Sequence, residues 1–223
     1  VVEDATEALG TKYTEGAYTG CFAGTMGTIG VYSFNGNKII TTGGGGMIVS
    51  NDKAILAHAK HLTTQAKSDT LNFIHDEIGY NYRMTNLQAA LGLAQIEQLE
   101  GFIEIKRRNY EHYKRDIPQI HGLSVLDFKD GIRSNHWFYS VYCDTSYPLR
   151  RDELIARLRE LNIQSRPIWG LIHEQKPYLD SLSYYIEKAV AYHDHVVNVP
   201  CSTSLTEDDV TYVISCIKEA IEI

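Results

Sequence analysis

The sequence lacks a surplus of positive charge, an apolar run of membrane-spanning length and a closely spaced pair of cysteines. Its 21 Lys and Arg residues against 28 Asp and Glu residues give a formal net charge of −7, which argues against a general nucleic-acid binder but leaves room for a local basic pocket that binds a phosphorylated ligand. A bilayer-spanning helix needs about 20 apolar residues, so we expect no membrane partner. The four scattered cysteines predict free thiols and a cytoplasmic protein: Cys21, Cys143, Cys201 and Cys216.

An initiator methionine is also missing at the first position. Val1-Val2-Glu3-Asp4 has the pattern of the end of a buried strand, with nothing before it. We therefore expect that an N-terminal part of the protein precedes this chain.

The first part of the chain combines frequent glycines with short apolar segments. Hydrophobic residues make up 43% and charged residues 22% of the sequence, as in an ordinary globular protein. Strands are expected at residues 30–34 and 47–49, with turns at 35–38 and 43–46. A helix is expected at 53–61, because Asn51 or Asp52 can accept hydrogen bonds from its first amides.

Two longer segments follow. Residues 63–82 show no clear period and predict a long loop, a kind of segment that often carries function. Thr85 or Asn86 then starts a long apolar-striped helix that continues through 106–108, with Gly101 as the expected bend.

The second half alternates helix and strand, which predicts an α/β fold class. The expected strands are 137–143, 163–166 and 196–200, and the expected helices are 151–161, 184–195 and 210–221, the last one capped by residues 206–209.

One lysine has companions that suggest chemistry. Lys38 lies on a turn after the strand that ends at Ser33, and Asp4 ends an earlier strand. A single lysine is usually an exposed surface residue, but ligands bind at the carboxyl ends of strands in α/β sheets. A lysine, an acid and a hydroxyl are the groups that hold pyridoxal 5′-phosphate (PLP): the lysine forms a Schiff base, and the acid keeps the pyridine nitrogen protonated.

The same residues belong to a longer ordered series of motifs. Glu3-Asp4-Ala5 is followed by Ser33-Phe34-x-x-x-Lys38-x-Ile40-Thr41-Thr42-Gly43-x-Gly45-Gly46 and by Gly79-Tyr80-Asn81-Tyr82-Arg83-Met84. In order and spacing they closely resemble the DegT/DnrJ/EryC1/StrS aminotransferases, fold-type-I PLP enzymes that aminate keto sugars attached to nucleotides. The resemblance covers the whole chain, and Arg166-Pro167-x-Trp169-x-x-x-His173-x-x-x-Pro177 is similar to the family's small-domain segment.

The resemblance implies the domain organisation. Residues 1–104 would be the C-terminal part of the large mixed-sheet PLP-binding domain, and residues 105–223 a C-terminal α/β small domain. Asn81 and Arg83 would reach the active site of a neighbouring subunit, one of them touching the cofactor phosphate, so a homodimer with shared sites is implied. For Arg83, an ion pair within its own chain is an equally good interpretation.

The resemblance also implies individual roles. Asp4 would pair with the pyridinium nitrogen, Ser33 would bind the cofactor phosphate, and Lys38 would form the Schiff base and shuttle a proton. Glu7 stands where many members carry Gln or His near the phenolic oxygen of the cofactor, and a carboxylate there would be repelled unless it is protonated or turned away. Gly44 replaces a glutamate of many members, which we interpret as a subfamily difference. Arg166, Trp169 and His173 would face the substrate.

The implied reaction moves an amino group from an amino acid, typically glutamate, to a 4-keto-6-deoxy nucleotide sugar. Residues 35–42 and 63–66 most resemble members that aminate UDP-linked N-acetylated sugars of bacillosamine or legionaminic acid pathways. Two alternatives stay open: a sugar dehydratase of the same fold, in which a histidine replaces the lysine, and a fragment that binds no cofactor.

Other patterns are weaker. Residues 43–46 lack the Gly-Lys-Ser/Thr ending of a phosphate-binding loop. The pairs His58 with His61 and His193 with His195 could each be drawn as a metal pair, but no carboxylate or cysteine completes either set convincingly, so we expect surface histidines and no metal. Trp137 and Trp169 are candidate core residues, although Trp169 lies close to Arg166 and so is also a candidate for the substrate wall.

Overall fold

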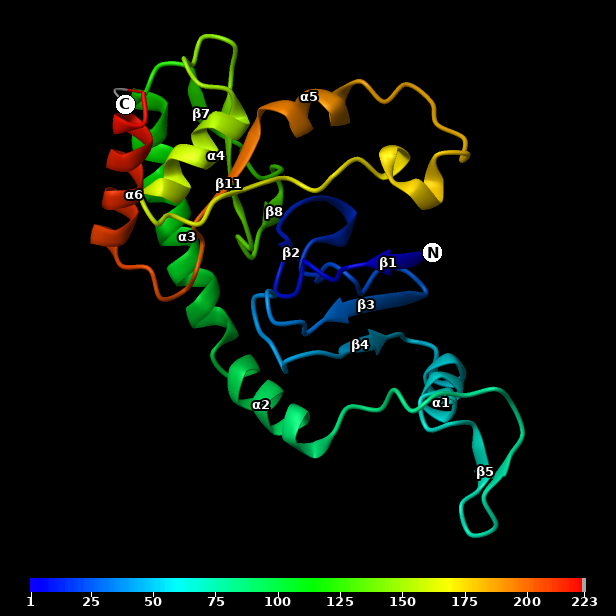
Figure 1. Cartoon of the computed structure of the whole chain (residues 1–223). Helices are drawn as coiled ribbons and strands as arrows, with labels where there is room; N and C mark the ends of the chain where they lie inside the picture. Colours follow the sequence, from blue (N-terminus) through cyan, green and yellow to red (C-terminus); the bar gives the residue numbers. More distant parts are fainter. Residues whose placement is uncertain (222–223) are drawn as a thin grey trace. The chain divides into compact units, whose positions relative to one another are not determined.

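A computed structural model describes residues 1–221, and the chain divides into two compact units (Figure 1). The first unit contains Val1–Glu104 and Phe128–Trp137, and the second contains Ile105–Asp127 and the chain from Phe138 onward. The segment Phe128–Trp137 therefore returns to the first unit after the chain has already entered the second.

A three-stranded mixed sheet forms the centre of the first unit, in the order β1-β3-β4. Strand β1 (Val2–Asp4) runs parallel to β3 (Ile29–Ser33), and β3 pairs antiparallel with β4 (Gly46–Val49). Since β1 is the edge strand of this sheet, Val2 is exposed and not buried as its sequence context suggests. The core beside the sheet consists of Ala5, Tyr32, Phe34, Ile40, Leu99 and Ile103.

Helix α1 (Lys53–Leu62) begins as predicted, because the Asp52 carboxylate accepts the amides of Ala54 and Ile55. The prediction of a loop at residues 63–82 is wrong in part. This segment contains a β-hairpin of β5 (Lys67–Asp69) and β6 (Ile74–His75), which pair antiparallel. A bridge between Thr64 and Asn81 closes its base.

The predicted long helix is two helices. Thr85 caps α2 (Asn86–Ile96) in a capping box with Gln88, and α3 (Leu99–Asp116) follows after a break. The break lies at residues 97–98 and not at Gly101, which is inside α3. Gln95 of α2 accepts the Thr41 amide at 2.8 Å, so α2 holds the segment that follows Lys38.

A second pairing in the first unit joins distant parts of the sequence. Strand β2 (Lys12–Tyr13) pairs with β8 (Ile132–Arg133). Arg133 also donates to both Glu100 oxygens and to the Gly10 carbonyl. These contacts anchor the returning segment Phe128–Trp137 in the first unit.

The second unit is built on an antiparallel sheet in the order β10-β11-β9-β7. Its strands are β7 (Leu123–Val125), β9 (Tyr139–Cys143), β10 (Arg166–Pro167) and β11 (Val196–Val199). All four residues of β11 are buried, and α4 (Arg151–Glu160) packs on β11 and α6 (Glu207–Glu219). Leu154, Ile155 and Leu158 face inward from α4, as predicted.

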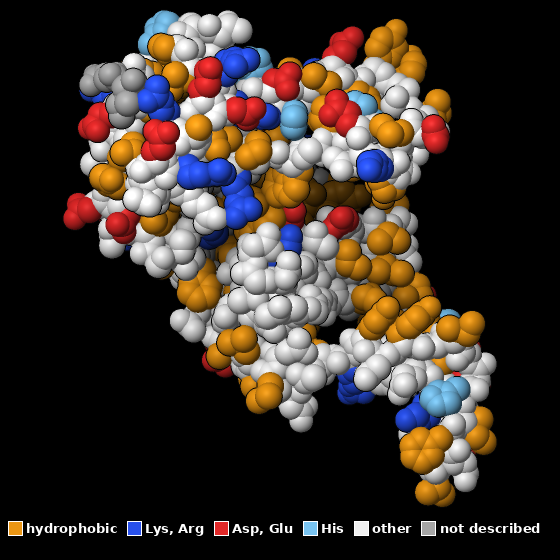
Figure 2. Space-filling model, viewed as in Figure 1, with side chains coloured by type: hydrophobic (Ala, Val, Ile, Leu, Met, Phe, Trp, Pro, Cys, Tyr) orange, Lys and Arg blue, Asp and Glu red, His pale blue; other side chains and the backbone are white. Residues whose placement is uncertain are grey.

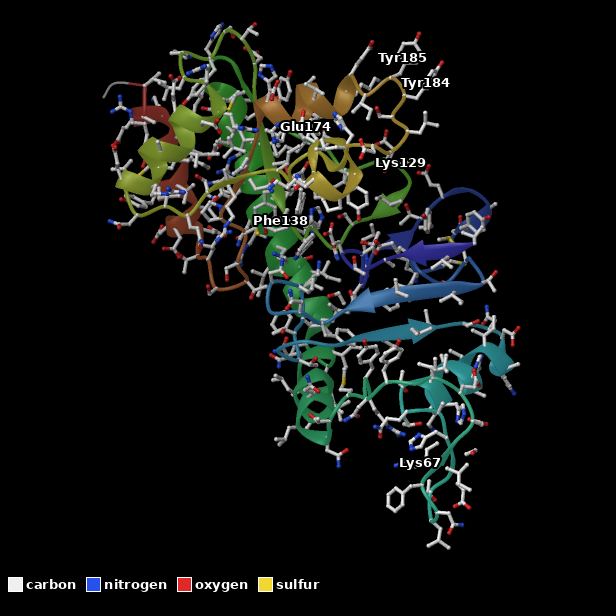
Figure 3. All side chains as sticks on the ribbon, turned by 45° about the vertical axis from the view of Figure 1, so that its right-hand side comes forward. Lys67, Lys129, Phe138, Glu174, Tyr184 and Tyr185 are labelled. Carbon is white, nitrogen blue, oxygen red and sulfur yellow. The ribbon has the colours of Figure 1, made fainter. Side chains whose placement is uncertain are left out.

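Helix α5 (Lys188–His195) is shorter than the predicted 184–195. Tyr185 has a φ of 48°, and this left-handed backbone cannot continue a right-handed helix. Figure 3 shows Tyr184 and Tyr185 projecting outward from the segment before α5. The remaining short elements are 3-10 helices at Gly16–Tyr18, Ile117–Gln119, Ile172–Glu174 and Lys176–Tyr178.

Helices and strands thus mix within both units, which confirms the predicted α/β class. Within residues 1–221, no helix has both the length and the apolar character that crossing a bilayer requires. All four cysteines carry free thiols, as predicted.

Candidate active site

The candidate site of the first unit lies where two parallel strands end. Asp4 is the last residue of β1 and Ser33 the last residue of β3, with Asp4 in register with Val31. Because the carboxyl ends of parallel strands meet at one edge of a sheet, both side chains stand at the edge where α/β proteins bind ligands.

Asp4 is held as a carboxylate. Its oxygen accepts hydrogen bonds from the Thr6 side chain and from the Thr6 amide, the latter at 3.2 Å, and these lower the pKa of Asp4 below its ordinary value. The positive charge of Lys38 lowers the same pKa further. Asp4 is therefore ionised at neutral pH and electrostatically coupled to Lys38.

Lys38 closes the turn after β3, where its amide donates to the Asn35 carbonyl at 3.1 Å. Its side chain is only 12% exposed. The Lys38 Nζ lies 4.2 Å from the ring centroid of Trp137 and 3.6 Å from Glu7 Oε1. A lysine enclosed between an aromatic ring and a carboxylate differs from the exposed surface lysine of the simplest interpretation.

The returning segment positions both neighbours of Lys38. Trp137 Nε1 donates to the Asn37 carbonyl at 2.7 Å, which ties the Lys38 turn to the ring that covers it. Asn135 Nδ2 donates to the carbonyls of Glu7 and Leu9 at 2.8 and 3.0 Å. One stretch of chain therefore supports the turn of Lys38 and the turn of Glu7 together.

His136 lies between these two anchors and adopts a left-handed backbone with φ 51°. Its amide donates to Ser134 Oγ at 3.0 Å, and the Trp137 amide donates to Asn135 Oδ1 at 3.1 Å. Left-handed backbone at a residue other than glycine costs energy and is often found at functional sites. Here it falls directly before Trp137, whose ring lies against Lys38.

Within residues 1–221, the Ser33 hydroxyl accepts a hydrogen bond but donates none. Its Oγ accepts the Asn35 amide at 3.3 Å, so the hydroxyl proton can be donated to an anion at the sheet edge. The side chains of Lys38, Asp4, Ser33 and Glu7 thus combine an amine, two carboxylates and a hydroxyl in one unit.

The structure does not join Asn81 and Arg83 to this group. Both are exposed, and within residues 1–221 neither has a hydrogen bond or ion pair to Lys38 or Asp4. Asn81 is fixed through the bridge to Thr64, and the neighbouring rings of Tyr80 and Tyr82 stack at 5.0 Å.

The three predicted substrate residues all lie in the second unit. Arg166 begins β10 and pairs with Asn198, and Trp169 is 60% exposed with its ring edge-on to Phe138 at 5.6 Å. His173 lies in the 3-10 helix Ile172–Glu174, 3.9 Å from the Glu174 carboxylate. It borders a hollow of about 440 Å³, which is also lined by Leu171, Tyr178, Leu182, Ile186 and Ala189.

Sequence reasoning missed Asn135 and the role of Trp137. The available signal was the run Ser134-Asn135-His136-Trp137, in which polar residues precede a tryptophan at the start of a predicted strand. That pattern reveals no partner, because Asn37 lies 100 residues earlier in the chain.

Comparison with known proteins identifies the family to which this chain belongs. The family model of the DegT/DnrJ/EryC1/StrS aminotransferases matches residues 1–218. The chain is 37% identical over 214 residues to EpsN of Bacillus subtilis (strain 168), provisionally described as a pyridoxal phosphate-dependent aminotransferase, with 94% of this chain and 53% of that protein covered.

A second relative is a GDP-perosamine synthase of Escherichia coli O157:H7, 37% identical over 220 residues, with 98% of this chain and 57% of the relative covered. Among solved structures, the aminotransferase TlmJ from Streptoalloteichus hindustanus superposes with a TM-score of 0.88 at 24% identity and covers 99% of this chain and 58% of TlmJ. That similarity shows the fold. The chain spans little more than half the length of the relatives it matches.

Proposed function

Because the chain belongs to the DegT/DnrJ/EryC1/StrS aminotransferase family, we propose that the protein is a PLP-dependent aminotransferase that acts on a nucleotide sugar. The observation that carries the proposal is the placement of Lys38 Nζ, enclosed between Trp137 and Glu7 and coupled to the carboxylate of Asp4. The presence of this lysine disfavours the dehydratase alternative, in which a histidine takes its place.

The residues fit the proposed cofactor. PLP, when bound, supplies an aldehyde for covalent attachment and a ring that withdraws electrons from the substrate carbon. Lys38 Nζ would hold it covalently, and the ionised Asp4 would keep a proton on the ring nitrogen. The Ser33 hydroxyl would donate to its phosphate.

Lys38 would also carry the proton of the reaction. A released Lys38 amine would be able to accept a proton from the substrate carbon and donate it to the cofactor carbon. Glu7 Oε1 lies 3.6 Å from Nζ, within ion-pair distance. We therefore propose that Glu7 orients the Lys38 side chain and that it need not contact the phenolic oxygen of the cofactor.

The substrate class is proposed from the family and its relatives. We propose a 4-keto-6-deoxy sugar on a nucleotide as the amino acceptor and glutamate as the donor. A GDP-perosamine synthase among the relatives supports an acceptor of this class. In the second unit, the hollow beside His173 and the exposed ring of Trp169 offer apolar and polar groups of the kind that contact a sugar, and Arg166 offers a cation for a diphosphate.

We also propose a homodimer in which Asn81 and Arg83 complete the partner's site. Their exposure is consistent with this role, because among the described residues 1–221 neither has a hydrogen bond or ion pair to the Lys38 site of its own chain. Helix α2, which follows them directly, exposes Leu87, Leu91, Leu93 and Ile96. Apolar side chains in such number on one helix favour burial against another molecule.

The proposal is tested by trapping the cofactor on the protein. Lys38→Ala is expected to abolish both the visible absorbance of added PLP on the protein and the covalent adduct formed on borohydride reduction. The matched control, Lys188→Ala, removes an exposed lysine of the second unit and is expected to retain both. An adduct of normal yield in Lys38→Ala would overturn the assignment.

A further inference from the structure

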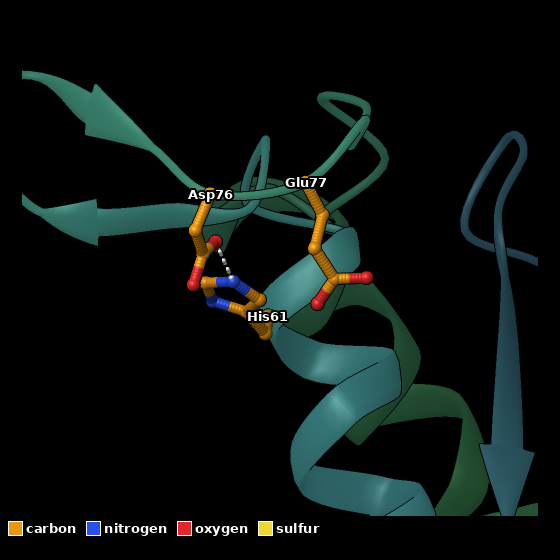
Figure 4. A group of neighbouring side chains, drawn as sticks. All are labelled: His61, Asp76 and Glu77. Carbon is orange, nitrogen blue, oxygen red and sulfur yellow. Dashed lines mark hydrogen bonds and ion pairs between the residues drawn. The ribbon is translucent and has the colours of Figure 1, made fainter.

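Four side chains from two neighbouring elements converge outside the Lys38 site. His58 and His61 lie one turn apart on α1, and Asp76 and Glu77 follow strand β6. Figure 4 shows three of the four side chains, His61, Asp76 and Glu77. His61 Nε2 is 2.6 Å from Asp76 Oδ1, and His58 Nε2 is 3.0 Å from both oxygens of Glu77. The sequence shows only the two histidines close together, and the fold supplies the two carboxylates.

We propose that His61, Asp76 and Glu77, with His58 as fourth ligand, form a structural Zn²⁺ site that clips the β5–β6 hairpin to α1. Two imidazole nitrogens and two carboxylates are a donor set that suits zinc. The two carboxylate charges cancel the charge of the ion. Four protein ligands leave no open position, so the site would stabilise the fold and would not activate a substrate.

The distances among His61, Asp76 and Glu77 are compatible with this coordination, and His58 adjoins the group through Glu77, whose oxygens lie 3.0 Å from its Nε2. Zinc lies about 2.0–2.2 Å from nitrogen and oxygen ligands, so the ligand atoms of a tetrahedral site are about 3.3 Å apart. The ligand atoms of His61, Asp76 and Glu77 all lie within 4.8 Å of one another. The shortest pair must separate by less than about 1 Å, and partly exposed side chains can make that adjustment.

The backbone beneath the cluster is already ordered. The His61 carbonyl accepts the Ala66 amide at 3.0 Å, and the Ala66 carbonyl accepts the Asp76 amide at 3.2 Å. Ala66 is fully buried. A Cβ on Gly79 would come within 2.4 Å of the Ala66 nitrogen, so the two strands of chain pack as closely as glycine allows. This framework holds the helix and the hairpin in register before any ion binds.

The β5–β6 hairpin would gain stability from a bound ion, because it buries few of its own side chains. Its apolar side chains are exposed, including Leu71 at 83%, Phe73 at 69% and Ile74 at 53%, and Figure 2 shows apolar side chains at its tip. Figure 3 places Lys67 on this arm, and its Nζ lies 5.1 Å from the Phe73 ring centroid. An isolated two-stranded hairpin is marginally stable in water, and exposed histidine–carboxylate pairs contribute little by themselves. A bound ion adds its binding free energy to the folded form.

The decisive measurement is Zn²⁺ binding to the intact protein, freed of any affinity tag and stripped with a chelator. Competition with a chromophoric chelator is expected to show one tightly bound Zn²⁺ per chain. His61→Ala is expected to weaken this binding by more than about 100-fold, and His58→Ala by about 10-fold. His121→Ala removes an exposed histidine elsewhere and is expected to bind as the unchanged protein does.

A second measurement tests whether Zn²⁺ stabilises the attachment of the β5–β6 hairpin to α1. Zn²⁺, but not Mg²⁺, is expected to slow proteolysis between residues 65 and 80 in the unchanged protein and in His121→Ala. The slowing should be lost in His61→Ala and in the double variant Asp76→Asn, Glu77→Gln, whose folding is checked by circular dichroism. Equal Zn²⁺ affinity in all variants, or weak binding without an effect on proteolysis, would show an adventitious ion only and overturn the proposal. Neither readout depends on aminotransferase activity, so each proposal can fail separately.

Discussion

At the scale of single residues, Asp4 offers the sharpest test of the active-site proposal. Asp4→Asn keeps the size of the side chain and an oxygen that accepts from Thr6, but removes the charge that would hold a proton on the cofactor ring. Since electrostatic groups at a reacting centre contribute about 100-fold or more to rate, kcat is expected to fall by about that factor while the fold is retained. Turnover of a keto nucleotide sugar and circular dichroism measure the two effects.

Asp208→Asn is the matched control, because it removes one exposed carboxylate on α6. We expect its kcat to equal that of the unchanged protein. Near-normal turnover in Asp4→Asn would remove Asp4 from the proposed mechanism.

The ionised side chain of Glu3, next to Asp4, contributes to the free energy of unfolding. Burial alone would raise its pKa, but hydrogen bonds from the amides of Gly27, Gly24 and Met26 outweigh burial and hold the pKa of Glu3 below its ordinary value. A depressed carboxylate pKa stabilises the fold above the unfolded pKa near 4.5, and this stabilisation is lost as pH falls through the folded value.

Glu3→Gln is therefore expected to lower the free energy of unfolding at pH 7 by about 1–2 kcal/mol. The difference from the unchanged protein should shrink as the pH falls below 4.5, because protonated Glu3 loses the same charge-assisted bonds. Denaturant titrations at several pH values measure this. A difference that is constant with pH would contradict the electrostatic account.

These residue-scale features were partly readable in the sequence. Lys38, Asp4 and Ser33 stand in local motifs at strand ends, where a short stretch of sequence is enough to place them. Trp137 and Asn135 act through contacts about 100 residues or more away in the chain, and no local pattern encodes such contacts. The proposed zinc site could not be predicted for the same reason, because α1 supplies only the two histidines and the two carboxylates come from the segment after β6.

At the scale of elements, capping of α6 is a local and measurable contribution. Thr206 Oγ1 accepts the Asp209 amide at 3.1 Å, and an Asp209 oxygen accepts the Thr206 amide at 2.8 Å. Thr206→Ala removes the hydroxyl half of this capping box and is expected to cost about 1 kcal/mol in unfolding free energy.

The control on the same helix is Thr211→Ala, an exposed threonine within the helix. It is expected to change unfolding free energy by less than about 0.5 kcal/mol. Equal losses in both variants would mean that the cap contributes nothing special to α6.

Helix caps were the most predictable feature of the elements. The break between α2 and α3 and the β5–β6 hairpin were the least predictable. Asp52 and Thr206 could be identified because N-cap residues act within three positions of themselves. The break at 97–98 contains no glycine or proline, while Gly101 fits into α3 with nothing within 4 Å of an added Cβ. The hairpin escaped prediction because its exposed apolar residues do not alternate and its turn lacks an Asn-Gly pair.

At the scale of the whole molecule, the proposed shared site predicts complementation between subunits. Lys38→Ala and Arg83→Ala homodimers are each expected to be inactive. A heterodimer of the two has one site with both residues intact, so full exchange of an equal mixture should restore about a quarter of normal activity.

Mass spectrometry of the intact dimer verifies the exchange, and turnover of the keto nucleotide sugar measures the recovery. Mixing Lys38→Ala with Asp4→Asn is the control, because both residues belong to one side of the site and mixing should restore nothing. Verified exchange without recovery in the Lys38 and Arg83 pair would contradict the shared site.

The return of residues 128–137 to the first unit also has a consequence for synthesis. Asn37 leaves the ribosome 100 residues before Trp137, the residue that donates to its carbonyl. At bacterial and eukaryotic elongation rates of about 5–20 residues per second, roughly 5–20 seconds pass between the synthesis of the Lys38 turn and the synthesis of Trp137. During that interval the Lys38 turn lacks the ring of Trp137, and the turn of Glu7 lacks its anchor Asn135. The proposed cofactor site is therefore completed only by a segment that belongs, in sequence, to the other half of the chain.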